Sequence, residues 1–146
     1  MFIPPPLLLL GAIGISLLLS KLSPLAPLVS SPTNLVGLVL IAGGIGLFLW
    51  TTRLFKHHKT TLHPKGKPSS LITAGPYRFT RNPIYVGFLL ISLGAAIFFA
   101  NILALVGPIV FFFFINTFII PFEEQMLGHT FGEKYHSYRT RTRRWI

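Results

Sequence analysis

Residues 84–122 read IYVGFLLISLGAAIFFA, then Asn101, then ILALVGPIVFFFFINTFIIPF. The runs on either side of Asn101, 84–100 and 102–122, contain no charged residue. A bilayer core about 30 Å thick is crossed by roughly 20 helical residues, so each run is close to the length of a transmembrane helix. Because a single residue separates the runs, the stretch predicts a tight antiparallel hairpin whose two open ends lie on one side of a membrane.

Two more apolar segments precede this hairpin, at about 7–22 and 34–52. A cleaved signal peptide is an alternative interpretation of the first. That segment lacks the basic start and the small-x-small cleavage site of such a peptide, which favours an uncleaved helix. With the hairpin spans at about 83–100 and 102–122, the segments predict an all-α integral membrane protein with a single domain, 1–146. It has about four transmembrane helices and a short cytoplasmic C-terminal helix.

The composition excludes an ordinary soluble domain and several kinds of site. Apolar residues make up 51% of the chain, charged residues 11%, and the formal charge is +10. That charge would suit nucleic acid, but the apolar runs leave no soluble surface for a basic face, so the expected partner is a membrane and not nucleic acid. The chain has no cysteine. This removes thiolate chemistry and cysteine-ligated metals, and no metal is expected.

The basic residues gather on two segments that flank the apolar spans. Lys and Arg near the ends of spans are retained on the cytoplasmic side, so a loop at 53–82, a tail at 123–146 and both termini are predicted to be cytoplasmic. Of the thirteen lysines and arginines, only Lys21 lies elsewhere. The other twelve are Arg53, Lys56, Lys59, Lys65, Lys67, Arg78, Arg81, Lys134, Arg139, Arg141, Arg143 and Arg144.

A glycine-rich run lies inside the second apolar segment, at 43–46. A phosphate-binding loop is one interpretation, but such loops lie at the start of a helix and not inside a span. Ala42 and Gly46 have the small-xxx-small spacing that lets membrane helices pack closely, which favours helix packing.

The start of the third span predicts a place for an anion. Asn82 is a good N-cap, and Pro83 fits the first helical position. A helix start has free N–H groups and partial positive charge, and with Arg81 beside it an anionic group would be held well. A helix cap without a ligand, beside arginines that are retained on the cytoplasmic side, explains the same residues. Tyr77 and Tyr85 would then be interfacial aromatics.

The acidic residues are confined to one short segment. Glu123, Glu124 and Glu133 are the whole set, and the first two are costly so near lipid unless they have cationic or hydroxyl partners. They either bind a ligand or pair with arginines and fasten the hairpin, and these accounts can coexist. If a helix runs on, with Gly128 and Gly132 as its weak points, one face carries residues at spacings of four and three. These are Glu123, Leu127, Phe131, Tyr135 and Tyr138.

The hairpin brings the two candidate regions, 81–83 and 123–124, to the same depth on the same side of the membrane. An anion-binding helix end, paired carboxylates and several tyrosines suit a small zwitterionic cofactor with a carboxylate, a positive charge and ribose hydroxyls. S-adenosylmethionine has these parts. The spacing indicates compatibility with this cofactor and does not identify it.

Several motifs follow one another between about residues 60 and 146. They are Gly75-Pro76-Tyr77-Arg78, Arg81-Asn82-Pro83-x-Tyr85-x-Gly87, Glu123-Glu124-x-x-Leu127, Phe131-Gly132-x-x-Tyr135-x-x-Tyr138 and Arg143-Arg144-Trp145. In this order they resemble the isoprenylcysteine carboxyl methyltransferase and phospholipid methyltransferase superfamily of integral membrane enzymes. Eukaryotic members usually carry His where this chain has Asn82. The chain therefore departs from the members that act on prenylcysteine. Bacterial-type members with Asn at this position are similar to the chain.

The resemblance implies methyl transfer from S-adenosylmethionine, bound in a cytoplasm-facing pocket, to a lipophilic acceptor that enters from the bilayer, in a bacterial inner membrane. The cofactor-binding residues that it implies are His63, Tyr77, Arg81, Asn82, Pro83, Tyr85, Gly87, Glu123, Glu124, Tyr135 and Tyr138. Arg81, Glu123 and Glu124 are the candidate catalytic residues. Arg81 would position a carboxylate acceptor, whereas a Glu or His would take the proton of an amine acceptor, and both chemistries stay open.

Two other functions remain as alternatives. Membrane reductases of the sterol-reductase type use NADPH and have a similar motif near their carboxyl ends, but they are generally longer and have more spans. A non-enzymatic polybasic membrane protein would use its cationic segments to bind anionic lipid. In that case the tyrosines and glutamates would have no role.

Overall fold

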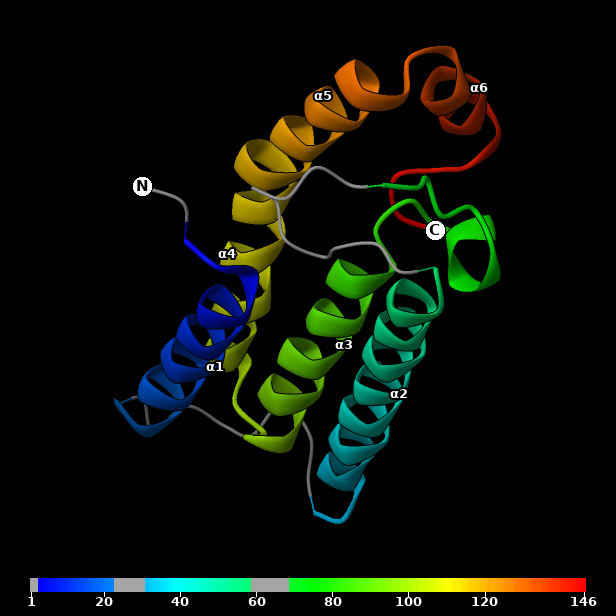
Figure 1. Cartoon of the computed structure of the whole chain (residues 1–146). Helices are drawn as coiled ribbons and strands as arrows, with labels where there is room; N and C mark the ends of the chain where they lie inside the picture. Colours follow the sequence, from blue (N-terminus) through cyan, green and yellow to red (C-terminus); the bar gives the residue numbers. More distant parts are fainter. Residues whose placement is uncertain (1–2, 23–30, 59–68) are drawn as a thin grey trace.

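The computed structural model describes residues 3–22, 31–58 and 69–146 (Figure 1). These residues are helical with one isolated β-bridge and no β-strand, which confirms the all-α class. The α-helices are α1 (Pro5–Leu22), α2 (Val36–His57), α3 (Pro83–Phe98), α4 (Val106–Phe114), α5 (Ile120–Phe131) and α6 (Glu133–Arg141). Shorter helical turns cover Thr33–Leu35, Gly75–Arg78 and Ile102–Leu105, and a π-helical turn covers Ile115–Ile119.

Three helical stretches are long and apolar enough to cross a membrane, namely Pro5–Leu22, Thr33–His57 and Ile102–Phe131. α3 is the fourth apolar helix and is shorter, at 16 residues. Two boundaries differ from the expectation by five residues or more. α2 continues past residue 52 to His57, and the last helix continues past residue 122 to Phe131. At 1.5 Å per residue the last helix is about 45 Å long, so it extends beyond an apolar core of about 30 Å.

α3 lies at the centre of the bundle, with α1 and α4 on one side and α2 on the other (Figure 1). The predicted hairpin between α3 and α4 is confirmed. At its bend, the Asn101 side chain accepts a hydrogen bond from the Leu103 N–H at 2.9 Å and donates to the Ser20 carbonyl at 3.4 Å. The start of α3 and the whole of α5 therefore lie at the same end of the bundle.

α2 and α3 approach each other through glycines. A Cβ on Gly37 would collide with the Gly94 carbonyl, and one on Gly44 with the Gly87 carbonyl. The prediction of close packing is confirmed for this helix, but the expected pair, Ala42 and Gly46, is wrong. Ala42 and Gly46 are exposed on another face of α2, where a Cβ on Gly46 would meet nothing within 4 Å.

Replacing Gly44 by alanine is therefore expected to destabilise the protein by roughly 1–3 kcal/mol, because the added methyl group cannot fit without separating α2 from α3. Gly43→Ala is the matched control in the same helix, since a Cβ there meets nothing within 4 Å. The measurement is the unfolding midpoint of each variant in detergent. Equal midpoints for the two variants would contradict the close approach of α2 and α3.

Candidate functional site

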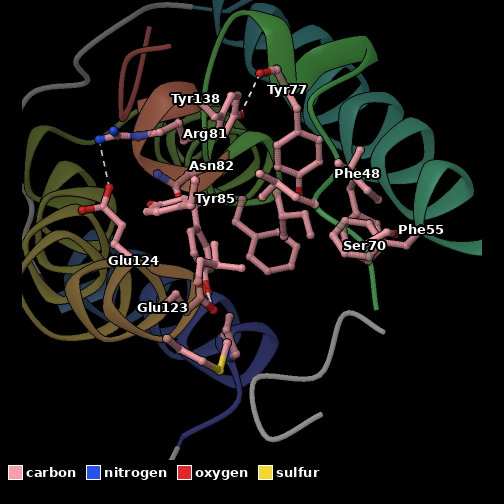
Figure 2. Close-up of a pocket in the computed structure, with 18 of the residues that line it drawn as sticks. Phe48, Phe55, Ser70, Tyr77, Arg81, Asn82, Tyr85, Glu123, Glu124 and Tyr138 are labelled. Atoms are coloured by element: carbon pink, nitrogen blue, oxygen red, sulfur yellow. Dashed lines mark hydrogen bonds and ion pairs between the residues drawn. The ribbon is translucent and has the colours of Figure 1, made fainter. Parts of the chain in front are cut away.

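A cavity of about 590 Å³ opens at the end of the bundle where α3 begins and α5 passes it (Figure 2). Its apolar wall includes Pro4, Pro5, Pro6, Phe48, Phe55, Leu71, Ile72, Ile84, Phe88, Met126 and Leu127. Its polar and tyrosine side chains are Ser70, Tyr77, Arg81, Asn82, Tyr85, Glu123, Glu124, Tyr135 and Tyr138. This volume lies within the range of sites that enclose a small organic ligand.

Eight of the eleven residues proposed from the sequence to bind a cofactor line this one cavity. Pro83 and Gly87 do not line it. Pro83 is buried at the first position of α3, and Gly87 packs against the backbone of α2 at Gly44. His63 lies outside the described residues. The cavity thus combines side chains from the loop before α3, from α3 itself and from α5 and α6.

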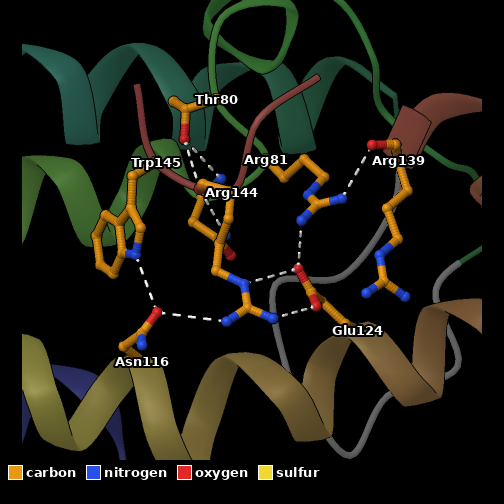
Figure 3. A network of polar contacts seen from close by, with 8 residues as sticks. Thr80, Arg81, Asn116, Glu124, Arg139, Arg144 and Trp145 are labelled. Carbon is orange, nitrogen blue, oxygen red and sulfur yellow. Dashed lines mark hydrogen bonds and ion pairs between the residues drawn. The ribbon is translucent and has the colours of Figure 1, made fainter. Parts of the chain in front are cut away.

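An ion-pair network joins the two candidate regions (Figure 3). The Arg81 Nη2 lies 2.9 Å from Glu124 Oε1, and the Arg144 Nη2 lies 2.7 Å from Glu124 Oε2. The predicted shared depth of Arg81 and Glu124 is confirmed by this contact. Both carboxylate oxygens of Glu124 are occupied by arginines, as the fastening account expected.

The chain after α6, residues 142–146, returns to the start of α3, and this segment is called the tail below. The Arg81 N–H donates to the Arg143 carbonyl at 2.9 Å, within a parallel bridge between Thr80 and Arg143. The Arg144 carbonyl accepts from the Thr80 hydroxyl at 3.0 Å and from the Asn82 side-chain amide at 2.9 Å. Asn82 does occupy the N-cap position, but its side chain makes no capping hydrogen bond. Instead, it holds the residues that follow α6.

A π-helical turn within the last long helix supplies the other anchor of the tail. The Asn116 Oδ1 accepts from the Trp145 Nε1 at 3.0 Å and from the Arg144 Nη1 at 3.4 Å (Figure 3). The Trp145 ring packs against Phe112, with 5.0 Å between centroids. A π-turn changes the direction of the side chains that follow it and is frequent at functional sites. Asn116 was not apparent as a site residue in the sequence.

Glu123 has a different environment from its neighbour. It lines the cavity, and its Oε1 accepts a 2.7 Å hydrogen bond from the Tyr85 hydroxyl. Among the described residues no lysine, arginine or histidine lies within 4 Å of its carboxylate, and no donor reaches its Oε2. The two adjacent glutamates are thus divided between an ion-pair network and an apolar cavity wall.

Two tyrosines connect α6 to the loop before α3. The Tyr138 hydroxyl donates to the Tyr77 backbone carbonyl at 2.7 Å. Burial raises the pKa of both tyrosine hydroxyls, so both remain protonated donors at neutral pH. Gly132 makes this contact possible: its φ of 53° ends α5 and turns the chain into α6, whereas Gly128 lies within the continuous helix.

A sequence match identifies the family of the chain. A model of the phospholipid methyltransferase family matches residues 32–134, more than half of the chain. The chain belongs to this family. The match covers α2, the loop before α3, the hairpin and α5, so it contains the cavity-lining residues of those elements. It supports the membrane methyltransferase superfamily that the motifs indicated.

Individual relatives of this phospholipid methyltransferase family member are found in bacteria and plants. An uncharacterised protein of Haemophilus influenzae is 40% identical over 63 residues, which are 43% of this chain and all of that protein. Protein-S-isoprenylcysteine O-methyltransferase B of Arabidopsis thaliana is 31% identical over 105 residues, 70% of this chain and 47% of that protein. Methanethiol S-methyltransferase 1 of Bradyrhizobium diazoefficiens is 33% identical over 91 residues, which are 60% of this chain and 31% of that protein.

The chain thus spans less than half the length of these two relatives with a named activity. Both are named as methyltransferases, one acting on an oxygen and the other on a sulfur. No solved structure is significantly similar to the chain. Family membership and the apolar helices together make the chain an integral membrane protein of a methyltransferase family.

Proposed function

We propose that this protein transfers a methyl group from S-adenosylmethionine to a lipophilic acceptor that enters the cavity from the bilayer. One observation carries the proposal: motifs about 40 residues apart in the sequence line one cavity, which has charged and hydroxyl groups beside a large apolar wall. The relatives with named activities are methyltransferases. This favours methyl transfer over an NADPH-dependent reductase or a non-enzymatic polybasic protein.

Unpaired polar atoms in the cavity wall fit the proposed cofactor. Arg81 Nε and Ser70 Oγ are buried and have no hydrogen-bond partner among the described residues. A ligand carboxylate would supply the acceptor that Arg81 lacks. The Phe48 and Phe55 rings line the same cavity (Figure 2), and aromatic rings are suited to contact an adenine base. Asn82 contributes less than expected, because its amide already donates to the Arg144 carbonyl.

Methyl transfer depends mainly on alignment of the acceptor with the methyl group. Bound S-adenosylmethionine supplies a methyl group on a sulfonium centre, and in-line displacement needs little acid–base assistance from the protein when the acceptor is already a nucleophile. Arg81 holds an anionic part of the ligand, Tyr77 and Tyr138 keep the loop before α3 against α6, and the apolar wall excludes water.

The side of the membrane follows from charge. Exposed basic residues lie at the cavity end of the bundle, on the last turn of α2, before α3 and in α6, for example Lys56, Arg78 and Arg141. We therefore place the cavity and both termini on the cytoplasmic side, in keeping with the positive-inside rule. A bacterial inner membrane is the corresponding proposal for its location.

S-adenosylhomocysteine is expected to stabilise the detergent-solubilised full chain by about 2.7 kcal/mol at a hundred times its dissociation constant, because it binds only the folded state. The measurement is the unfolding midpoint as a function of ligand concentration. NADPH at equal concentrations serves as the control ligand and should leave the midpoint unchanged. A midpoint that responds to NADPH and not to S-adenosylhomocysteine would reject the proposed function.

A further inference from the structure

We propose that Asn116 is a positioning residue for the cofactor, and that it acts by fixing Arg144 and, through Arg144, the orientation of Arg81 at the cavity. The inference rests on the proposed function and deepens it by naming a residue outside the cavity that sets the affinity for the cofactor. Neither Asn116 nor Arg144 lines the cavity, so each acts on a bound ligand only through other side chains.

The first argument is the way in which Arg81 is held. Its Nη2 lies 2.9 Å from Glu124 Oε1, and its Nη1 donates to the Arg139 carbonyl at 3.2 Å. Its Nε is buried and has no hydrogen-bond partner among the described residues. Because a guanidinium group is planar, holding the two terminal nitrogens also fixes the direction of the Nε–H. That N–H is the donor proposed above for the ligand carboxylate.

The second argument is the way in which Glu124 is held. Arg144 grips its carboxylate with two nitrogens, Nε at 3.2 Å from Oε1 and Nη2 at 2.7 Å from Oε2. Such a two-point contact fixes the plane of the carboxylate, whose Oε1 also meets Arg81. The remaining nitrogen of Arg144, Nη1, donates to Asn116 Oδ1 at 3.4 Å (Figure 3). A continuous chain of polar contacts therefore connects Asn116 to Arg81.

The third argument is the π-helical turn at Ile115–Ile119, which contains Asn116. Asn116 and Glu124 are eight residues apart on the last long helix. In a regular α-helix, residues eight apart point about 80° apart. A π-turn closes its hydrogen bonds over five residues instead of four and so holds one more residue, which reduces this angle to about 20°. The π-turn thus brings Asn116 to the face of Glu124, where one guanidinium contacts both.

The fourth argument is the presence of a carboxamide in an apolar helix. Asn116 and Thr117 are the two polar residues of the apolar run 102–122. A polar side chain in a membrane span is costly unless it has partners, and such residues often mark functional sites. Here the Asn116 Oδ1 accepts from Arg144 and, at 3.0 Å, from the Trp145 Nε1. An apolar side chain of similar size would fill the same space without an acceptor for Arg144.

The proposal is tested with Asn116→Leu, which keeps a similar size and removes the acceptor. The dissociation constant of S-adenosylhomocysteine, measured by calorimetry on the full chain in detergent, should rise about tenfold, because a hydrogen bond to a charged group is lost. Asn116→Asp keeps an oxygen acceptor for both donors and should remain within threefold of the parent chain. If the leucine variant does not fold, Asn116→Ala provides the same measurement.

Trp145→Phe is the matched control for the second donor. It keeps an aromatic ring against Phe112 and removes only the Nε1 hydrogen bond to Asn116, while the contact with Arg144 stays. Its affinity for S-adenosylhomocysteine should stay within twofold of the parent chain. A loss as large as that of Asn116→Leu would show that the tail as a whole, and not Arg144, carries the effect.

Gly37→Ala separates cofactor affinity from stability. A Cβ at this position would collide with the Gly94 carbonyl, at the end of α3 that lies away from the cavity. The variant should therefore lower the unfolding midpoint and leave the dissociation constant of S-adenosylhomocysteine unchanged. An increase equal to that of Asn116→Leu would mean that any destabilised variant binds weakly, and the positioning role would be refuted.

Combining Asn116→Leu with Glu124→Gln tests the route. The double variant should bind S-adenosylhomocysteine no more weakly than Glu124→Gln alone, because Asn116 acts through the carboxylate that this substitution removes. Additive losses, or equal affinities of Asn116→Leu and the parent chain, would overturn the inference and leave the proposed function standing. A parent chain that does not bind S-adenosylhomocysteine would instead reject the proposed function, and this inference with it.

Discussion

Glu124→Gln should lower the free energy of unfolding by about 3–5 kcal/mol, because it removes the negative charge shared by two arginines. The side chains of Glu124 and Arg81 are 8% and 10% exposed, so neither is well solvated, and Arg144 is 31% exposed. The substitution keeps the size of the side chain and leaves the Arg81 guanidinium buried beside a neutral amide. The measurement is denaturant or thermal unfolding in detergent.

Glu133→Gln is the matched control for this substitution. Glu133 is exposed in the first turn of α6, where a carboxylate is worth only about 0.3–1 kcal/mol through the helix dipole. The Glu124 variant should also respond more weakly to S-adenosylhomocysteine, since Arg81 loses the contact that holds it at the cavity. If the two glutamine variants unfold at the same midpoint, the ion-pair network does not contribute as the structure indicates.

The convergence of the two motifs could be predicted because it depends on one short element. A single residue, Asn101, separates two apolar runs of similar length, so the helix that follows it must return alongside the one before. This return of the chain depends on neither side-chain packing nor a partner. The hairpin brings the two regions to the same level, where Arg81 and Glu124 lie 2.9 Å apart.

The different roles of Glu123 and Glu124 could not be predicted in the same way. Successive residues point about 100° apart around a helix, so the position of α3 decides which glutamate meets Arg81 and which meets Tyr85. The sequence gives the helix but not its rotation about its own axis. For this reason both glutamates received the same set of roles from the sequence.

The glycine contacts carry a signal that the small-xxx-small pattern missed. Gly37 and Gly44 are seven residues apart, and so are Gly87 and Gly94, which they meet on α3. A spacing of seven keeps residues on nearly one face of a helix. A search for glycines seven residues apart in both spans would have selected the four glycines in contact. It would not have selected Ala42 and Gly46, which are four residues apart.

The tail was the least predictable part of the site. Arg144 is one of five lysines and arginines near the carboxyl end, and nothing in the sequence distinguishes it from the other four. Its special place depends on the positive φ of Gly132, which turns α6 back toward α3, and on the π-turn that presents Asn116. Gly132 was an expected weak point of the helix, but so was Gly128, which lies within α5, and the π-turn has no pattern in the sequence that identifies it.

Arg144→Ala is accordingly expected to destabilise the protein by about 3 kcal/mol, toward the lower end for a broken buried pair because Arg144 is partly exposed. Its guanidinium binds both Glu124 and Asn116, and hydrogen bonding to Glu124 raises its pKa, so it stays charged. Without it, Glu124 keeps only Arg81, and the tail loses its link to the π-turn. Unfolding in detergent measures the loss.

Arg143→Ala removes an equal charge one residue away and is the matched control. The Arg143 side chain is exposed, and its backbone carbonyl can still accept from Arg81 after the substitution. Its midpoint should remain within about 0.5 kcal/mol of the parent chain, as for most surface changes. Combining Arg144→Ala with Glu124→Gln should cost less than the sum of the two, because both remove the same ion pair. Strict additivity would show that Arg144 stabilises the protein through Asn116 and not through Glu124.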